Sequence, residues 1–284
     1  MSHPAAAAGS PVAAGLPAAT SLSGAAPVSG APSGAAPVSG APSGAARLSG
    51  ARLSGDLSPA DLDVLDNPAW SSLAGVHARF AEAYGQAARY QRDVAPFHAL
   101  ADPTDPRAWA DLAQLVPLGE AVTIAGAGGV AHPGWEVEGS IAGVQLVDVS
   151  LRAEPEPAAV RLGAADVPEI LDLIERTRPG PYLRRTVELG TYLGLRENGA
   201  LIAMAGERLH PTGWTEISAV CTDPAWRGRG LATRLVRAVA AGIRERGETP
   251  FLHTSAANAP AIRLYESIGF VLRKKTDFTA YRRI

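Results

Sequence analysis

The sequence has one cysteine, few aromatic residues and no excess of one charge. With only Cys221 it can form no internal disulfide, so we expect a reducing, cytoplasmic environment. The formal net charge of −2 and the lack of long charged runs argue against nucleic acid or a membrane surface as a partner. No apolar run is long enough to span a bilayer. The composition, 46% hydrophobic and 19% charged, is that of a globular protein.

Residues 1–56 differ from the rest because they consist almost entirely of Ala, Gly, Pro, Ser and Val. A decapeptide at 23–32 is repeated at 33–42. Few bulky apolar groups are present to offset the entropy of ordering the backbone, so we expect a disordered tail. A secretory signal peptide is the alternative, but prolines interrupt the apolar stretch and no basic residue precedes it.

The remaining chain reads as two units joined at 152–158, where Glu-Pro-Glu-Pro is typical of a short stiff linker. Residues 57–151 predict a smaller α/β domain. Its expected elements are a helix from Pro68 to about Ala88, an extended segment at 89–100, a helix from Pro106, and strands at 121–125 and 141–149.

A glycine-rich stretch from Gly126 to Ala131 matches the dinucleotide-binding fingerprint. That fingerprint needs a helix whose N-terminus begins at the glycines and points at a pyrophosphate. Pro133 and Gly134 would break such a helix. We therefore interpret the stretch as a plain loop.

Residues 159–284 predict a larger unit with the element order β-α-β-β-β-α-β-α-β-β around one mixed sheet. The expected elements are a strand at 160–162, a helix at 166–177, strands at 192–196, 201–208 and 214–222, a helix ending near Arg246, a strand at 251–254, a helix at 258–267, and strands at 270–273 and 278–282.

The most informative stretch runs from Arg227 to Ala232, between a predicted strand and a predicted helix. Its glycines allow close backbone approach, and the first helical turn has unpaired N–H groups that suit a diphosphate. It lacks the Gly-Lys-Ser/Thr of a P-loop, so nothing is placed to hold Mg²⁺. The pattern indicates a pyrophosphate that is bound without being cleaved, as in coenzyme A.

This stretch resembles motif A of the GNAT superfamily of acyl-CoA-dependent acyltransferases, with Arg227, Gly230 and Ala232 at its fixed positions. The segment from Asn258 to Phe270 resembles the family's motif B. The resemblance covers 159–284 and implies a GNAT-like α/β fold with acetyl-CoA as co-substrate and no metal.

Carried over residue by residue, the resemblance implies which groups contact the coenzyme. The backbone from Gly228 to Thr233 would bind the diphosphate, the strand end would pair with the pantetheine arm, and Asn258 would hydrogen-bond that arm. The implied contact residues are Val220, Cys221, Thr222, Arg227, Gly228, Arg229, Gly230, Leu231, Ala232, Thr233 and Asn258. Cys221, in an apolar strand, is given no catalytic role.

The resemblance also implies that Tyr265 is the general acid that protonates the leaving thiolate, although a core aromatic is the alternative. For the general base we prefer Glu216, which matches the glutamate position of the histone-type members. His253, which titrates in the useful range, and a water chain remain open.

We therefore predict an N-acetyltransferase that moves an acetyl group from acetyl-CoA to an amine by direct attack. A non-catalytic acyl-CoA-binding regulatory module and an acetyltransferase for protein N-termini or lysines are the alternatives. The first unit, 57–151, would be a degenerate acyltransferase-like domain that serves as a lid or as a wall on the amine side. Neither the acceptor amine nor the oligomeric state follows from the sequence.

Overall fold

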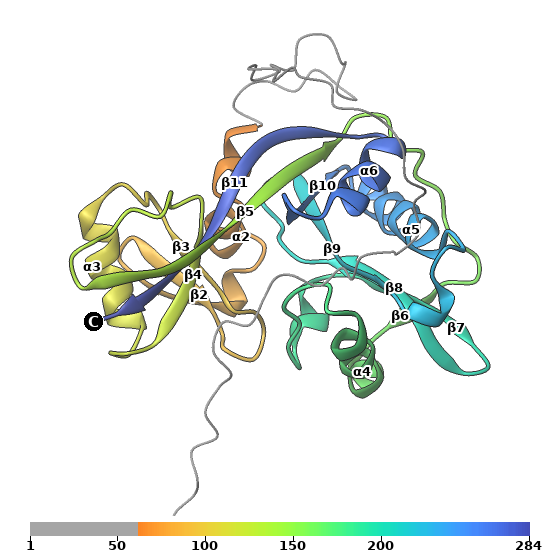
Figure 1. Ribbon diagram of the computed structural model, residues 1–284, viewed down its shortest axis with the longest axis horizontal. Helices are drawn as coiled ribbons and strands as arrows, with labels where there is room; N and C mark the ends of the chain where they lie inside the picture. Colours follow the sequence, from red (N-terminus) through yellow and green to blue (C-terminus); the bar gives the residue numbers. More distant parts are fainter. Residues whose placement is uncertain (1–61) are drawn as a thin grey trace, which may run out of the picture.

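The computed structural model describes residues 62–284, so the predicted tail lies outside the described residues. Within them, eleven strands form one sheet in the order β1-β2-β3-β4-β11-β5-β10-β9-β8-β7-β6 (Figure 1). Neighbours are antiparallel except for β3–β4 and β9–β10, which are parallel. The mixed α/β sheet agrees with the predicted fold class.

The strands are β1 (Ala81–Tyr84), β2 (Ala87–Tyr90), β3 (Phe97–Leu100), β4 (Ala121–Ala125), β5 (Trp135–Asp148), β6 (Val160–Leu162), β7 (Tyr192–Glu197), β8 (Ala200–Glu207), β9 (Trp214–Thr222), β10 (Thr249–Ser255) and β11 (Phe270–Arg283). The α-helices are α2 (Pro68–Ala74), α3 (Pro106–Leu115), α4 (Val167–Thr177), α5 (Leu231–Glu245) and α6 (Ala259–Ser267). Short 3₁₀ turns are η1 (Val64–Asp66), η2 (Ala78–Phe80), η3 (Ala164–Asp166), η4 (Thr186–Leu189) and η5 (Pro224–Trp226).

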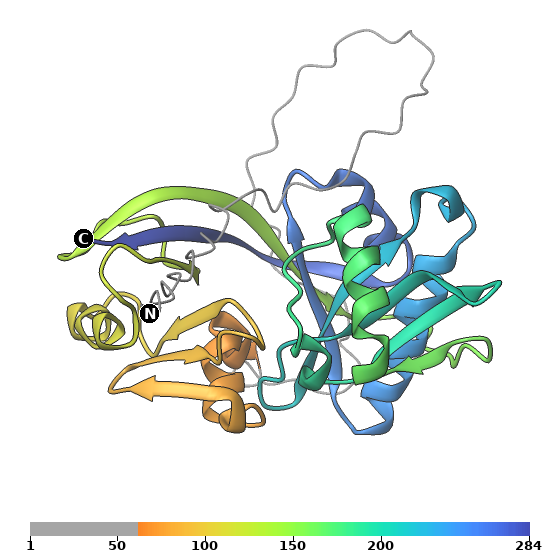
Figure 2. The ribbon, with the colours of Figure 1, turned by 90° about the horizontal axis from the view of Figure 1, so that it is seen from below.

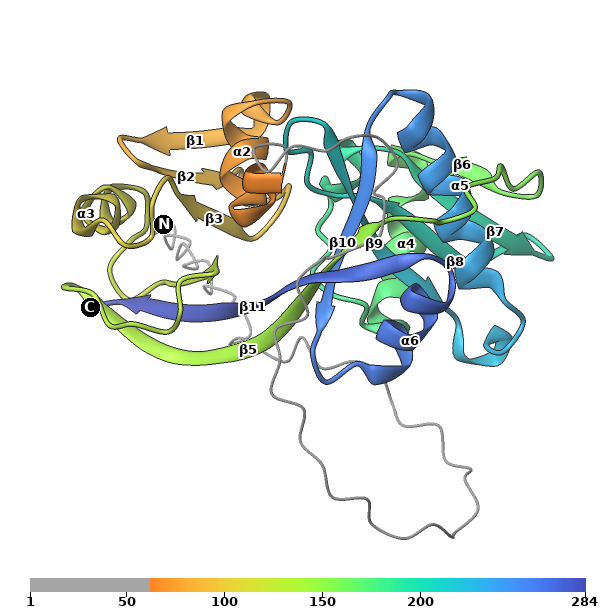
Figure 3. The same ribbon diagram turned by 90° about the horizontal axis from the view of Figure 1, so that it is seen from above.

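Helices cover both faces of the sheet around β8 and β9. On one face, α5 buries Leu235, Val239 and Ile243, which recur at the four-residue spacing of a helix stripe. On the other face, α4 buries Ile170 and Leu173 (Figures 1 and 3). Both helices were predicted from such apolar periodicity, so this part of the fold agrees closely with the prediction from the sequence.

A long ribbon made of β5 and β11 connects the two ends of the molecule (Figure 2). Each strand has fourteen residues. Along its other edge, β11 pairs with β4. The prediction of two short strands at 270–273 and 278–282 is wrong. The polar residues between them stay in the ladder, with a register shift between Leu272 and Lys274. Strand β5 precedes residues 152–158 in the chain, and both of its neighbours in the sheet, β10 and β11, follow them. One sheet therefore joins the two predicted units, and their division into two domains stays a prediction.

The helix predicted from Pro68 to about Ala88 is also wrong beyond its second turn. Helix α2 ends at Ala74, and after η2 the chain enters the hairpin β1–β2. Gly75 interrupts the helix, and Gly85 forms the hairpin turn at φ +54°. The extended segment predicted at 89–100 is likewise divided, with a turn between β2 and β3. Apolar spacing alone misled the prediction, since Tyr84 is 53% exposed.

The glycine-rich stretch from Gly126 to Ala131 is a loop, as interpreted from the sequence. Gly126, Gly128 and Gly129 all have positive φ, and no helix begins there. Among residues 62–284, no helix has the length and apolar character needed to cross a membrane.

Candidate active site

Strands β9 and β10 pair over three residues and then separate. The last pair joins Glu216 to Phe251, after which β9 pairs only with β8 and β10 only with β5. A register shift against β8 and a positive φ of 52° at Ala219 mark a bulge at this point. From Ile217 to Thr222, the edge of β9 on the side of β10 therefore pairs with no strand of the described chain. The backbone along this free edge can pair with an extended ligand.

The glycine loop lies directly after this free edge. Gly228 and Gly230 have φ values of 77° and 72°, which favour glycine, and Gly230 caps α5. A Cβ at either position would meet no atom within 4 Å. The loop is exposed, and the first N–H groups of α5 have no intrahelical acceptor. The arrangement can hold an anion such as a diphosphate.

Two arginines of the loop are positioned by their neighbours. The Arg227 Nε donates to the carbonyl oxygen of Thr222 at 3.3 Å, which ties the loop to the end of β9. The Arg229 guanidinium lies over the ring of Trp226, 4.4 Å from its centroid.

Helix α6 presents the two predicted motif B residues. The Asn258 Oδ1 accepts from the N–H of Ala261 at 3.2 Å, so this residue caps the helix. Its Nδ2 has no partner among the described residues. Tyr265 is 8% exposed and packs edge-to-face on Phe270.

A cavity of about 870 Å³ lies between β10, the β5–β11 ribbon and the segment that follows α4. Residues from both predicted units line it, because the ribbon and β3–β4 contribute one wall. Its lining includes Phe97, Thr123, Ser140, Arg178, Pro181, Arg208, His253, Ser255 and Phe278. His253 therefore faces this space, whereas Tyr265 and Glu216 do not line it.

Glu216, Arg208 and His253 form one buried cluster beside the cavity. Glu216 is fully buried, and its carboxylate accepts two hydrogen bonds from Arg208, at 2.6 and 2.8 Å. The His253 Nδ1 lies 2.8 Å from the Glu216 Oε1. Arg208 also lies over the Phe97 ring, 4.9 Å from its centroid. The buried carboxylate is thus fully paired.

Burial and neighbouring charges set the titration of these groups. Burial raises the pKa of the Glu216 carboxyl, but the Arg208 guanidinium and the His253 hydrogen bond outweigh it and lower the pKa to about 2. Burial raises the pKa of the Tyr265 phenol to about 12. Burial likewise raises the pKa of the Cys221 thiol to about 11, so that thiol stays protonated at neutral pH.

Comparison with known proteins bears on this arrangement. A family model described as FR47-like protein matches residues 192–279. A solved structure from Novosphingobium aromaticivorans DSM 12444, assigned to the GNAT family of acetyltransferases, is 39% identical, with a TM-score of 0.71. The similarity covers 78% of this chain and 98% of that one. The chain belongs to the GNAT family.

Two curated relatives of this GNAT chain match shorter segments. One is a mycothiol acetyltransferase from Thermomonospora curvata, and the other is the N-alpha-acetyltransferase RimI of Mycobacterium tuberculosis. Each is 37% identical over 82 residues, which is 28% of this chain. The matched segments span 27% of the first relative and 51% of the second.

The GNAT fold brings most of the predicted site residues together in two places. The implied coenzyme contacts, Val220 to Thr222 and Arg227 to Thr233, gather at the free edge of β9 and the start of α5. Glu216 and His253, which were predicted as alternative general bases, form a hydrogen bond with each other. In residues 62–284, no group of three His, Cys, Asp or Glu side chains could hold a metal ion.

Sequence reasoning missed Arg208, the third member of the cluster of Glu216 and His253, and Gln145, whose Nε2 lies 3.0 Å from the His253 Nε2. Arg208 follows β8, and the β8–β9 hairpin brings it opposite Glu216. A cation and an anion on adjacent predicted strands could have suggested that pair. Gln145 is a lone amide inside a predicted apolar strand, and a buried polar residue of that kind calls for a partner.

Proposed function

We propose that this protein transfers an acetyl group from acetyl-CoA to an amine by direct attack. The observation that carries the proposal is the free edge of β9 leading into the open glycine loop, with a cavity beside the neighbouring strand β10. A single chain thus offers an elongated site for the coenzyme and a separate space for an acceptor. The mycothiol acetyltransferase and RimI relatives support acetyl transfer to an amine.

The residues present fit acetyl-CoA. The positive φ values of Gly228 and Gly230 leave open space where a side chain would stand, and the N-terminus of α5 offers N–H donors to a diphosphate. Val220 and Thr222 would pair their backbones with the pantetheine arm, and the free Nδ2 of Asn258 would donate to it. Acetyl-CoA supplies the thioester carbon that the amine attacks.

Tyr265 would protonate the departing thiolate. Since burial raises the pKa of its phenol to about 12, the proton is present at neutral pH. The phenol gives up its O–H proton as the carbon–sulfur bond breaks. The hydroxyl makes no hydrogen bond within the described residues, which leaves it available for a ligand.

Among the three routes for the base, the geometry supports His253 with Glu216 as its partner. Only His253 faces the cavity, while the Glu216 carboxylate is held by Arg208 and its pKa is lowered to about 2. A carboxylate with so low a pKa is a weak base for an ammonium. It can instead stabilise the imidazolium that forms when His253 takes a proton. The cytoplasmic location stays a prediction.

A thiol-release assay with acetyl-CoA against a panel of amines, amino acids and peptides tests the proposal. We expect release of coenzyme A that depends on the acceptor, and an acetyl-CoA-dependent rise in Tm. A panel with no productive acceptor, together with an unchanged Tm, would overturn it. Release without dependence on any acceptor would instead indicate hydrolysis.

A further inference from the structure

Both ring nitrogens of His253 have partners, and the second partner comes from the first predicted unit. Gln145 on β5 lies directly opposite His253 on β10 in the strand register. It is fully buried, and its Nε2 lies 3.0 Å from the His253 Nε2. Two nitrogens at this distance can form a hydrogen bond only if one of them carries no proton on that side.

The other contacts of Gln145 settle which way its amide faces. Its Oε1 accepts from the Arg273 Nη1 at 2.9 Å, and a guanidinium can only donate. Its Nε2 donates to the carbonyl oxygen of Leu65 at 2.8 Å. The amide nitrogen therefore faces His253 and donates its second N–H to the imidazole.

This orientation fixes the protonation state of His253. The Nε2 must accept, so the ring proton lies on Nδ1 and is donated to the Glu216 Oε1 at 2.8 Å. Arg208 keeps Glu216 ionised, so the carboxylate is a constant acceptor for that proton. His253 is thus held neutral, with an unprotonated Nε2.

We propose that Gln145 is a positioning residue that holds His253 in the neutral tautomer able to accept a proton from the acceptor amine. This inference rests on the proposed function. In the step itself, an N–H bond of the attacking amine breaks and an Nε2–H bond forms on His253. Gln145 then gives up its bond to the ring and keeps its bond to Leu65, while Glu216 stabilises the imidazolium.

The alternative is that Gln145 only joins β5 to its neighbours. A structural role of that kind would affect stability, but it would not affect the tautomer or the pH profile. The charged groups around His253 must be held constant in such a test. They are Glu216 and Arg208 behind the ring, Arg273 beyond Gln145, and Glu138, Glu175 and Arg178 in the cavity lining.

The test is ¹⁵N NMR of the histidine side chains in the full chain, combined with pH profiles of kcat. In the wild type we expect a neutral His253 with the proton on Nδ1. In Gln145→Glu a carboxylate faces Nε2, so we expect both nitrogens to be protonated near neutral pH, and kcat to fall at least about tenfold. Gln145→Met, which cannot donate, should give mixed tautomers and a smaller loss.

Asp66→Asn is the matched control, because it weakens the Arg273 ion pair without touching the ring. We expect it to keep the wild-type tautomer and kcat. If both Gln145 variants keep the wild-type ¹⁵N signature, or change it while kcat and its pH profile stay the same, the positioning role is overturned. Because the NMR readout needs no turnover, failure of the proposed acetyl transfer would be recognised separately.

Discussion

The His253 Nδ1 donates to the Glu216 Oε1 at 2.8 Å, across the point where β9 and β10 separate. Glu216 belongs to the last residue pair between the two strands, and His253 lies on the part of β10 that no longer pairs with β9. The contact therefore links the cavity to the strand edge proposed to bind the coenzyme. Anything that weakens this cluster should affect stability and turnover together.

Arg208→Met should destabilise the protein because it leaves the fully buried Glu216 carboxylate without its counter-charge. We expect a loss of about 3–5 kcal/mol in the free energy of unfolding near neutral pH, measured by urea denaturation. Arg282→Met removes a more exposed ion pair with Glu138, and this control should cost less than about 1 kcal/mol.

The pH dependence of that loss follows from the pKa of Glu216. The folded-state pKa of about 2 lies below the reference value of 4.5, so its stabilisation is present above that value and is lost as the pH falls toward 2. The difference between wild type and Arg208→Met should therefore shrink under acidic conditions. A difference that stayed constant would contradict the assigned pairing.

Tyr265→Phe tests the proposed acid. The variant keeps the ring that packs on Phe270, so we expect stability within about 1 kcal/mol of the wild type and a fall in kcat of about tenfold or more. Because the pKa of the phenol is raised to about 12, Tyr265 should add no alkaline limb to the wild-type rate below about pH 10. An unchanged kcat would remove the acid assignment.

The second half of the fold could be predicted because local signals agree there. Leu235 and Val239 recur at helical spacing, Asn198-Gly199 marks a hairpin, and Gly230 begins the helix after the glycine loop. The first half could not be predicted as well. Half of the residues in its short strands β1 and β2 are alanine, which favours helix over strand. These strands are stabilised by the pairing of β1 with β2 and of β2 with β3, and by contacts with α3.

The candidate site was predictable only as far as its residues lie close in sequence. The loop from Arg227 to Thr233 is a continuous segment, so its glycine turn and the start of the helix could be predicted directly. The partners of His253 come from β5 and β9, and no local pattern reports which side chains a sheet places opposite each other. Glu216 and His253 thus appeared as alternatives in the sequence, whereas the structure joins them.

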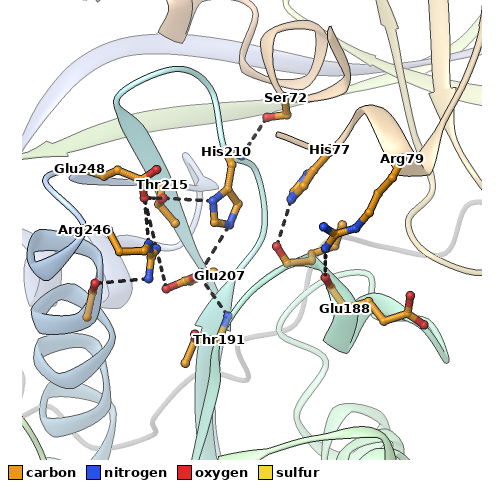
Figure 4. Close-up of polar contacts among 12 residues, drawn as sticks. Ser72, His77, Arg79, Glu188, Thr191, Glu207, His210, Thr215, Arg246 and Glu248 are labelled. Carbon is orange, nitrogen blue, oxygen red and sulfur yellow. Dashed lines mark hydrogen bonds and ion pairs between the residues drawn. The ribbon is translucent and has the colours of Figure 1, made fainter. Parts of the chain in front are cut away.

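A second buried cluster, at the contact of α2 and η2 with the β8–β9 turn, contains His77 and His210 (Figure 4). Their rings lie 4.9 Å apart, and the His77 Nε2 bonds to the carbonyl oxygen of Leu189 at 3.0 Å. Burial lowers the pKa of each histidine to about 4. Both are therefore neutral in the folded state near neutral pH.

This cluster should make stability fall in mild acid. In the unfolded chain the two histidines take up protons near the reference pKa of 6.5, whereas in the folded protein they do so near 4. Their contribution to the free energy of unfolding is therefore complete above pH 6.5 and declines as the pH falls toward 4. Between about pH 7 and pH 5 we expect a loss of about 1–2 kcal/mol per histidine, by urea denaturation. His77→Gln and His210→Gln should each flatten the slope. An equally steep slope in both variants would refute the assignment.

Gly230→Ala tests whether the glycine loop binds the coenzyme, and Gly213→Ala is its matched control. Both glycines have positive φ, 72° and 77°, and at both an added Cβ would meet no atom within 4 Å. Backbone strain should therefore cost each variant about 1 kcal/mol in unfolding free energy. Gly213 lies in the β8–β9 turn, away from the loop, so only Gly230→Ala should raise the KM for acetyl-CoA, by about tenfold. Equal KM values in the two variants would mean that the start of α5 does not hold the diphosphate.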